Sequence, residues 1–322
     1  MIRQTRRAFL ASTAAFAAAP ALAQQQGVTT LVVPFPPGGS TDALARLLQP
    51  GLQSRLGGTI VIENRAGAAG AIGAAQVAKS PADGTSLLVT FDSHAVIPAI
   101  LDKPPVDVEK ELVPVFLVGT APYVIAANAG RPFNTFADVV AASKDKPGSV
   151  KYASVGIGTI GHLAMTVLAK RSGVEITHVA YRGGGPAMND VVGGHVDLIC
   201  GSAALITPQL GGGAVRPIMQ MGRSRLDLLG QTQTAIEAGF AGFEALAWWG
   251  VFAPKDTPPA TVARVADALK ATISETTISA RLKETQQMTL VLGGPDELRT
   301  FFAAQVEGWG KVVRENGIKA QS

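Results

Sequence analysis

The 322-residue chain contains one cysteine, four histidines and few charged residues. Cys200 lies in the apolar run VDLIC, so no disulfide can form within the chain, and we expect this side chain to pack in the core. The sequence has no H-E-x-x-H, C-x-x-C or G-x-S-x-G string, and its histidines are not spaced as metal ligands. These absences argue against zinc-dependent, dithiol and serine-hydrolase chemistry. We expect neither a metal nor a cofactor.

Long apolar runs and a strong net charge are also missing. Beyond the amino-terminal region, no run approaches the ~18 apolar residues that indicate a membrane-spanning helix. Residues 1–23 carry three arginines and no acid, so the rest of the chain holds 25 basic and 24 acidic residues, a net charge of +1. No basic block stands out, which argues against nucleic acid as a partner.

The amino-terminal region has the pattern of an export signal. Arg6 and Arg7 precede an apolar run of small residues that ends in the A-x-A string at 21–23. The T-R-R-A-F-L string is similar to a twin-arginine signal, which directs folded proteins across the bacterial inner membrane. We predict cleavage after Ala23, a mature chain that starts at Gln24, and a periplasmic location. No cysteine follows the cleavage site, which excludes a lipid anchor there.

Strand-like and helix-like runs alternate almost throughout the mature chain, which predicts an α/β fold. Its length indicates two lobes. No flexible linker separates them, so we expect strands to cross between the lobes in the extended stretches 117–126 and 246–254. This arrangement assigns 27–122 plus 251–322 to lobe one and 123–250 to lobe two, with a hinged cleft between them.

The segment TLVVPFPPGGSTDALARLL, residues 30–48, predicts a strand, a glycine turn and a helix. The first N–H groups of a helix have no partner inside it, and the helix dipole adds partial positive charge, so such a turn can bind an anion. Pro36 and Pro37 have no N–H. We therefore expect the donors to lie between Gly38 and Thr41, with Asp42 favouring the dipole. The alternative is an ordinary capped turn that binds nothing.

A second turn, KYASVGIGTIGHLAM, contains G-x-G-x-x-G at Gly156, Gly158 and Gly161. This string formally matches the dinucleotide fingerprint, and twin-arginine export serves proteins that fold around cofactors, so a nucleotide-dependent oxidoreductase is the alternative function. The acid expected at the end of the following strand is missing, because that strand ends at Tyr181 and Arg182. A cradle for a small anion is therefore favoured.

Other polar residues follow strand-like runs, where ligands lie in open α/β sheets. Ser93 and His94 follow TSLLVTF, and Arg182 begins the turn RGGGP, where it offers a fixed positive charge for a carboxylate. His162 lies in the first turn of a helix, where we expect a neutral ring that lines or caps the site.

The strings VVPFPPGGSTDALARLL, VIENRAGAAGAIGA, GTIGHLA, HVAYRGGGPAMNDVVGGHVDL and WWGVFAPKDTPP resemble the substrate-binding receptors of tripartite tricarboxylate transporters, also called Bug receptors. The resemblance is collinear over essentially the whole mature chain. It implies a monomeric periplasmic binding protein of type II-like fold, without enzymatic activity. It also implies a small organic carboxylate as ligand and membrane permease subunits as partners. A membrane sensor is an alternative partner.

In this family, backbone N–H groups of two opposed loops often hold the ligand. By position the loops are 37–42 and 156–162, with 181–184 and Asp197 nearby. The candidate ligand contacts are Pro37, Gly38, Gly39, Ser40, Thr41, Asp42, Ser93, His94, Gly156, Ile157, Gly158, Thr159, Gly161, His162, Tyr181, Arg182, Gly183 and Asp197.

Two positions depart from the family pattern. The family often has Asn where this chain has Ile97 and Ile157. If these side chains line the cleft, a carboxylate beside them would lose hydrogen bonds, at about 1–3 kcal/mol per unsatisfied group. We then expect a ligand with one anionic end and a less polar or aromatic body, rather than a tricarboxylate such as citrate. The alternative is that both isoleucines point into the lobe cores.

Overall fold

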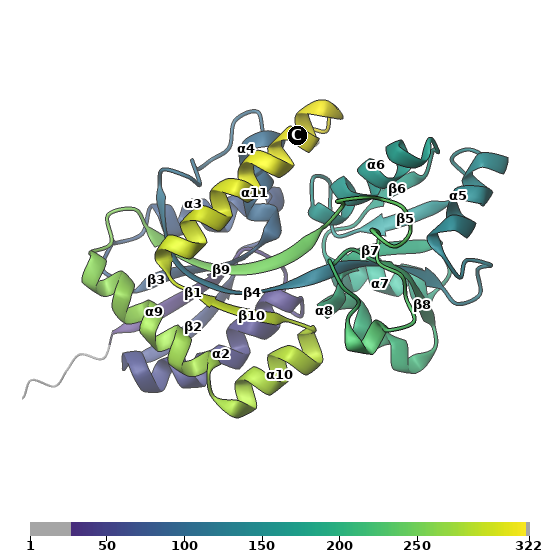
Figure 1. The fold of residues 1–322 in the computed structure, drawn as a ribbon. Helices are drawn as coiled ribbons and strands as arrows, with labels where there is room; N and C mark the ends of the chain where they lie inside the picture. Colours follow the sequence, from purple (N-terminus) through teal and green to yellow (C-terminus); the bar gives the residue numbers. More distant parts are fainter. Residues whose placement is uncertain (1–26, 320–322) are drawn as a thin grey trace, which may run out of the picture.

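The computed structural model describes residues 27–319, which form two α/β lobes side by side (Figure 1). The predicted signal sequence and its cleavage site lie outside these residues. The strands form one sheet in the order β2-β1-β3-β9-β4-β7-β5-β6, while β8 and β10 both pair with β4. The α/β fold predicted from the alternation is confirmed.

The lobe that holds both ends of the described chain is built around three parallel strands. Its strands are β1 (Val28–Val33), β2 (Thr59–Asn64), β3 (Ser86–Phe91) and β10 (Thr289–Gly293). Its helices are α2 (Ser40–Leu56), η1 (Ala68–Gly70), α3 (Ala71–Ala78), η2 (Asp92–Val96), α4 (Ile97–Ile100), α9 (Pro259–Ile273), α10 (Thr276–Gln286) and α11 (Pro295–Glu315). Every residue of β3 is buried, as expected for a strand covered by helices on both faces.

The second lobe repeats this plan with shorter strands. Its strands are β5 (Lys151–Ser154), β6 (Thr177–Ala180), β7 (Leu198–Ser202) and β8 (Val215–Gln220). Its helices are α5 (Phe136–Asp145), α6 (Ile160–Ser172), α7 (Gly184–Val192), α8 (Ala203–Ile206), η3 (Thr207–Gly212) and η4 (Asp227–Leu229). Helix α6 ends at Ser172 and is followed by Gly173, whose φ of 63° is the left-handed conformation that glycine adopts without strain.

Two long strands run between the lobes, β4 (Leu112–Asn128) and β9 (Leu246–Pro254) (Figure 1). They pair antiparallel from Leu112 to Pro122 of β4, and the remainder of β4 pairs with β7 and β8. These strands contain the two stretches expected to cross. The lobe boundaries at 122 and 251 stay a prediction.

Candidate functional site

Turns from both lobes meet beside the crossing strands. In the first lobe they follow the carboxyl ends of β1, β2 and β3, and in the second they follow β5 and β6. A Cβ atom placed on Gly183 would lie 3.7 Å from Pro36 Cγ. A Cβ on Gly158 would lie 2.7 Å from Ile100 Cδ1, so any larger residue at this position would require the Ile100 side chain to move. A Cβ on Gly156 would lie 3.6 Å from Tyr181 O, so the loops 156–162 and 181–183 are adjacent, and Gly183 lies against Pro36, next to the loop 37–42.

In the first turn, the carboxylate of Asp42 serves the fold. It accepts hydrogen bonds from Gly38 N–H at 3.0 Å and from Asn64 Nδ2 at 3.0 Å, and its ion pair with Arg46 is 2.9 Å long. Burial alone would raise the pKa of Asp42, but the hydrogen bonds from Arg46, Gly38 and Asn64 outweigh it and hold this pKa below its usual value. Asp42 and the Gly38 N–H are therefore removed from the candidate ligand contacts.

The N–H groups that follow are the ones left for a ligand. Among residues 27–319, no acceptor bonds to the N–H of Gly39, Ser40 or Thr41, and Gly39 provides no side-chain cap for α2. A helix of 17 residues with an uncapped start is a favourable place for an anion.

The second turn is also held by its own hydrogen bonds. Gly156 N–H donates to Ser154 Oγ at 3.3 Å, Gly158 N–H donates to His162 Nδ1 at 3.0 Å, and Thr159 Oγ1 donates to Gly156 O at 2.7 Å. The donors expected from Gly156, Gly158 and Thr159 therefore have internal partners. Within the described residues, the N–H groups of Ile157 and Ile160 have none, and α6 also starts without a side-chain cap.

A buried acid links the lobes next to these turns. The carboxyl of Asp92 is fully buried and accepts from the Tyr123 hydroxyl at 2.8 Å, and the N–H of Gly161 also approaches that hydroxyl. The other carboxyl oxygen has no partner among the described residues. Burial raises the pKa of Asp92 well above its ordinary value. Sequence reasoning missed Asp92, although an acid directly after the apolar strand SLLVTF was a signal.

Ser93 and His94, which follow Asp92, have structural roles. His94 is 1% exposed and lies 4.9 Å from the ring of Phe252 and 5.3 Å from that of Phe302. Burial lowers the pKa of His94 to about 3. This aromatic surrounding removes His94 from the candidate ligand contacts. Ser93 is buried too, and its hydroxyl donates to Ala69 O at 3.1 Å.

The turn that Ser93 supports was also missed. Residues 67–70 have φ values of 138°, 48°, 56° and 98° in order, and Ala68 and Ala69 adopt a conformation that non-glycine residues rarely take. A Cβ on Gly70 would lie 3.4 Å from Pro34 Cβ, which places this turn against the first one. Strained backbone of this kind gathers at binding sites. The signal in the sequence was the glycine spacing in NRAGAAGAIG.

The remaining candidates lie at opposite ends of the strands of the second lobe. Gly183 lies at the meeting of the turns, Arg182 is exposed, and the Tyr181 hydroxyl donates to Asp190 at 2.6 Å. Burial and that bond raise the pKa of Tyr181 to about 12. Asp197 accepts from Lys151 N–H at 2.8 Å, at the amino-terminal end of β5. The turn 156–162 follows the other end of that strand, so Asp197 is not near it.

The two isoleucines lie in different surroundings. Ile97 is fully buried in a cluster that includes Phe252 and Leu298, so it does not contact a ligand. Ile157 is partly exposed in the second turn. Of the two isoleucines, Ile157 is the one that solvent reaches.

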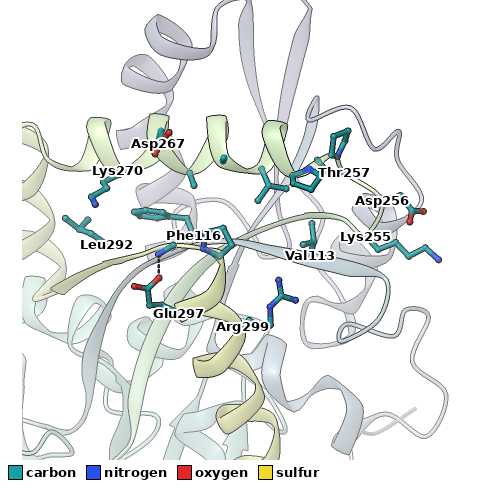
Figure 2. A pocket seen from close by; sticks show the side chains of 17 residues that line it. Val113, Phe116, Lys255, Asp256, Thr257, Asp267, Lys270, Leu292, Glu297 and Arg299 are labelled. Atoms are coloured by element: carbon teal, nitrogen blue, oxygen red, sulfur yellow. Dashed lines mark hydrogen bonds between the residues drawn. The ribbon is translucent and has the colours of Figure 1, made fainter.

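A groove of about 730 Å³ lies elsewhere in the first lobe, between α9 and the start of α11 (Figure 2). Apolar side chains such as Phe116 line it together with charges of both signs, including Lys255, Asp267 and Arg299. The Glu297 carboxylate accepts from Gly294 N–H at 2.9 Å, so the start of α11 already has an anion from the protein itself. None of the candidate residues lines this groove.

No helix within residues 27–319 combines the length and apolar character needed to cross a bilayer. In the same residues, no group of three or more His, Cys, Asp or Glu side chains is placed to hold a metal ion.

The profile of one family, described as the tripartite tricarboxylate transporter family receptor, matches residues 44–318. The periplasmic binding protein BugD is 31% identical in sequence, with a TM-score of 0.84 over 91% of this chain and 99% of its own. Rpa4515 of R. palustris, solved with adipate, is 30% identical, with a TM-score of 0.86 over 91% of this chain and 98% of its own. MatC of Rhodopseudomonas palustris, solved with malate, is 29% identical, with a TM-score of 0.82 over 89% of this chain and 98% of its own.

The profile match covers most of the chain, and the similar structures extend over nearly the whole length of each relative. The family consists of solute-binding receptors rather than enzymes, so the oxidoreductase alternative is set aside. The chain belongs to the tripartite tricarboxylate transporter receptor family, a family of periplasmic solute-binding proteins.

Proposed function

We propose that this protein captures a small organic carboxylate between its two lobes, with backbone N–H groups at the starts of α2 and α6 as the donors. The observation that carries the proposal is the contact between turns of opposite lobes, Gly183 with Pro36 and Gly158 with Ile100, beside two helix starts that lack side-chain caps. Hydrogen bonds to a charged group contribute about 1.5–3 kcal/mol each, so a few such donors suffice to hold one carboxylate. The adipate in Rpa4515 and the malate in MatC support a carboxylate as the ligand class.

We further propose that the anionic end of the ligand lies at Gly39, Ser40 and Thr41, and that a less polar body lies against Ile157. Adipate carries a carboxylate at each end, but its four methylene groups give it a less polar body than citrate, so it is the better of the two as a probe for this site. The protein is exported by the twin-arginine route and cleaved after Ala23. It acts as a monomer and delivers the ligand to the membrane permease subunits of a tripartite transporter. Delivery to a membrane sensor is the alternative.

The experiment removes one N–H donor without removing the helix. Ser40 is the first residue of α2, where proline is tolerated, and Gly39 before it is extended, as the residue before proline prefers. Ser40→Pro deletes the N–H, while Ser40→Ala keeps the N–H and deletes only the hydroxyl. Thr276→Pro is the matched control, because Thr276 is exposed and opens α10 after an extended Glu275.

Calorimetry with adipate, malate and citrate measures the affinity of each ligand for the unmodified protein and the variants. We expect adipate to bind the unmodified protein more tightly than citrate. Ser40→Pro should weaken adipate about 10- to 100-fold, which corresponds to the loss of one charge-assisted hydrogen bond, and Thr276→Pro should leave adipate binding unchanged. Equal adipate affinity in Ser40→Pro and the unmodified protein would refute the role of this helix start. Citrate binding as tight as adipate binding would refute the ligand shape.

A further inference from the structure

Three aromatic rings are stacked directly behind the second turn. The ring of His178 on β6 lies 4.0 Å from that of His162 on α6, with 9° between their planes. On its other side it lies 4.9 Å from the ring of Tyr152 on β5, with 24° between planes. The stack therefore joins two neighbouring strands, β5 and β6, to helix α6, which begins at the end of the second turn.

Each imidazole is also bonded to the turn. His162 Nδ1 accepts from Gly158 N–H at 3.0 Å. His178 Nε2 shares a hydrogen bond of 2.7 Å with Ser154 Oγ, and this hydroxyl in turn bonds to both the N–H and the carbonyl of Gly156. The two glycines have φ values of 148° and 76°, and each is bonded to a side chain of the turn that His178 contacts, Ser154 for Gly156 and His162 for Gly158.

We propose that His178 is a positioning residue for ligand binding: it supports His162 by stacking and Ser154 by hydrogen bonding, and so keeps the turn 154–162 in its binding conformation. This inference rests on the proposed function, because the turn supplies the Ile157 and Ile160 donors. In this proposal His178 does not contact the ligand.

The bond from Gly158 determines the protonation of His162. A backbone N–H only donates, so Nδ1 must be bare and the neutral ring must carry its proton on Nε2. Burial lowers the pKa of His162 to about 4, and burial together with the adjacent His162 lowers that of His178 to about 3. Among the described residues, no Asp, Glu, Lys or Arg shifts either value, and Tyr152 is the titratable neighbour on the far face. Both rings are therefore neutral at periplasmic pH, and protonation of Nδ1 in acid would break the bond to Gly158.

The first measurement is the tautomer, read from ¹⁵N shifts of the labelled, ligand-free protein at pH 7. We expect His162 with a bare Nδ1 and a proton on Nε2. A proton on Nδ1 would overturn the proposal, because the turn would then lack its acceptor.

The second measurement is amide hydrogen exchange at Gly156 and Gly158 in variants of the ligand-free protein. His178→Ala should lower the protection of Gly158 about tenfold, the size of effect expected for one hydrogen bond. His178→Ala should also lower the protection of Gly156. In His178→Phe the stacked ring is restored but the hydrogen bond to Ser154 is not, so we expect the protection of Gly158 to recover and that of Gly156 to remain low. His195→Phe is the matched control, since His195 is an exposed histidine of the same lobe outside the stack. Gly158 protection within twofold of the unmodified protein in His178→Ala would overturn the proposal.

Adipate affinity then separates this inference from the function on which it rests. We expect the dissociation constant for adipate to rise about tenfold in His178→Ala and to return most of the way in His178→Phe. Failure of the unmodified protein to bind adipate or malate would count against the proposed function, while the exchange data would still decide whether His178 holds the turn. Unchanged adipate affinity in His178→Ala, with Gly158 protection lost, would refute the link to binding.

Discussion

Asp92 makes the stability of this protein depend on pH in an unusual direction. Its carboxyl is fully buried, and burial raises its pKa in the folded protein. The unfolded chain loses this proton near its ordinary pKa of about 3.9. Between that value and the raised pKa, the folded state binds more protons than the unfolded state. The stability contributed by Asp92 is therefore fully present below pH of about 4 and is lost as the pH rises through the folded pKa, by up to about 1.4 kcal/mol per pH unit.

Asp92→Asn removes this dependence while keeping the size of the side chain and an oxygen that accepts from Tyr123. We expect the variant to gain stability relative to the unmodified protein as the pH rises, by up to about 3 kcal/mol between pH 5 and pH 7. Urea denaturation followed by tryptophan fluorescence at each pH measures the difference. Asp145→Asn, at an exposed residue of α5, is the control and should show no such trend. A difference between Asp92→Asn and the unmodified protein that is constant from pH 5 to pH 7 would show that Asp92 ionises normally and refute the reasoning.

Two further predictions concern the strained turn and the amino terminus. Ala68→Gly should stabilise the protein by up to about 1 kcal/mol, because Ala68 has a φ of 48°, whereas Ala271→Gly on the exposed side of α9 should destabilise it by about 1 kcal/mol. Denaturant midpoints compare the two variants, and a loss of stability in Ala68→Gly would contradict the strain. Intact mass of the periplasmic protein should correspond to a chain that begins at Gln24, and Arg6→Lys with Arg7→Lys should retain the precursor in the cytoplasm. Normal export of that double variant would refute the twin-arginine route.

The turns and helix starts of the candidate site were predictable because their local signals are strong. Glycine turns between strand-like and helix-like runs correctly located the starts of α2 and α6, since glycine supplies backbone conformations that other residues avoid. The sequence motifs did not show which backbone N–H groups already have a hydrogen-bond acceptor within the protein. Gly38 bonds to Asp42, and Gly158 bonds to His162, each through a side chain four residues away. These bonds depend on side-chain rotamers that a glycine pattern does not encode.

Contacts between distant residues were harder to predict. Tyr123 meets Asp92 across 31 positions of sequence, and His178 on β6 stacks on His162 in the first turn of α6. Asp197 was misplaced because the end of the strand at which a polar residue lies follows from the register of β7 against β5. His94 was misplaced because a polar side chain after a strand points toward the site or into an aromatic cluster depending on how the chain turns.

By itself, the sequence determined the alternation of strands and helices, the position of the glycine turns and the family. Each of these is written in local periodicity and in residue types over short spans. Only the tertiary structure decided which donors remain free, where the buried acid lies, and which histidine supports the turn. Those features arise when strand register and lobe packing bring together side chains that are far apart along the chain, and local patterns carry no record of that.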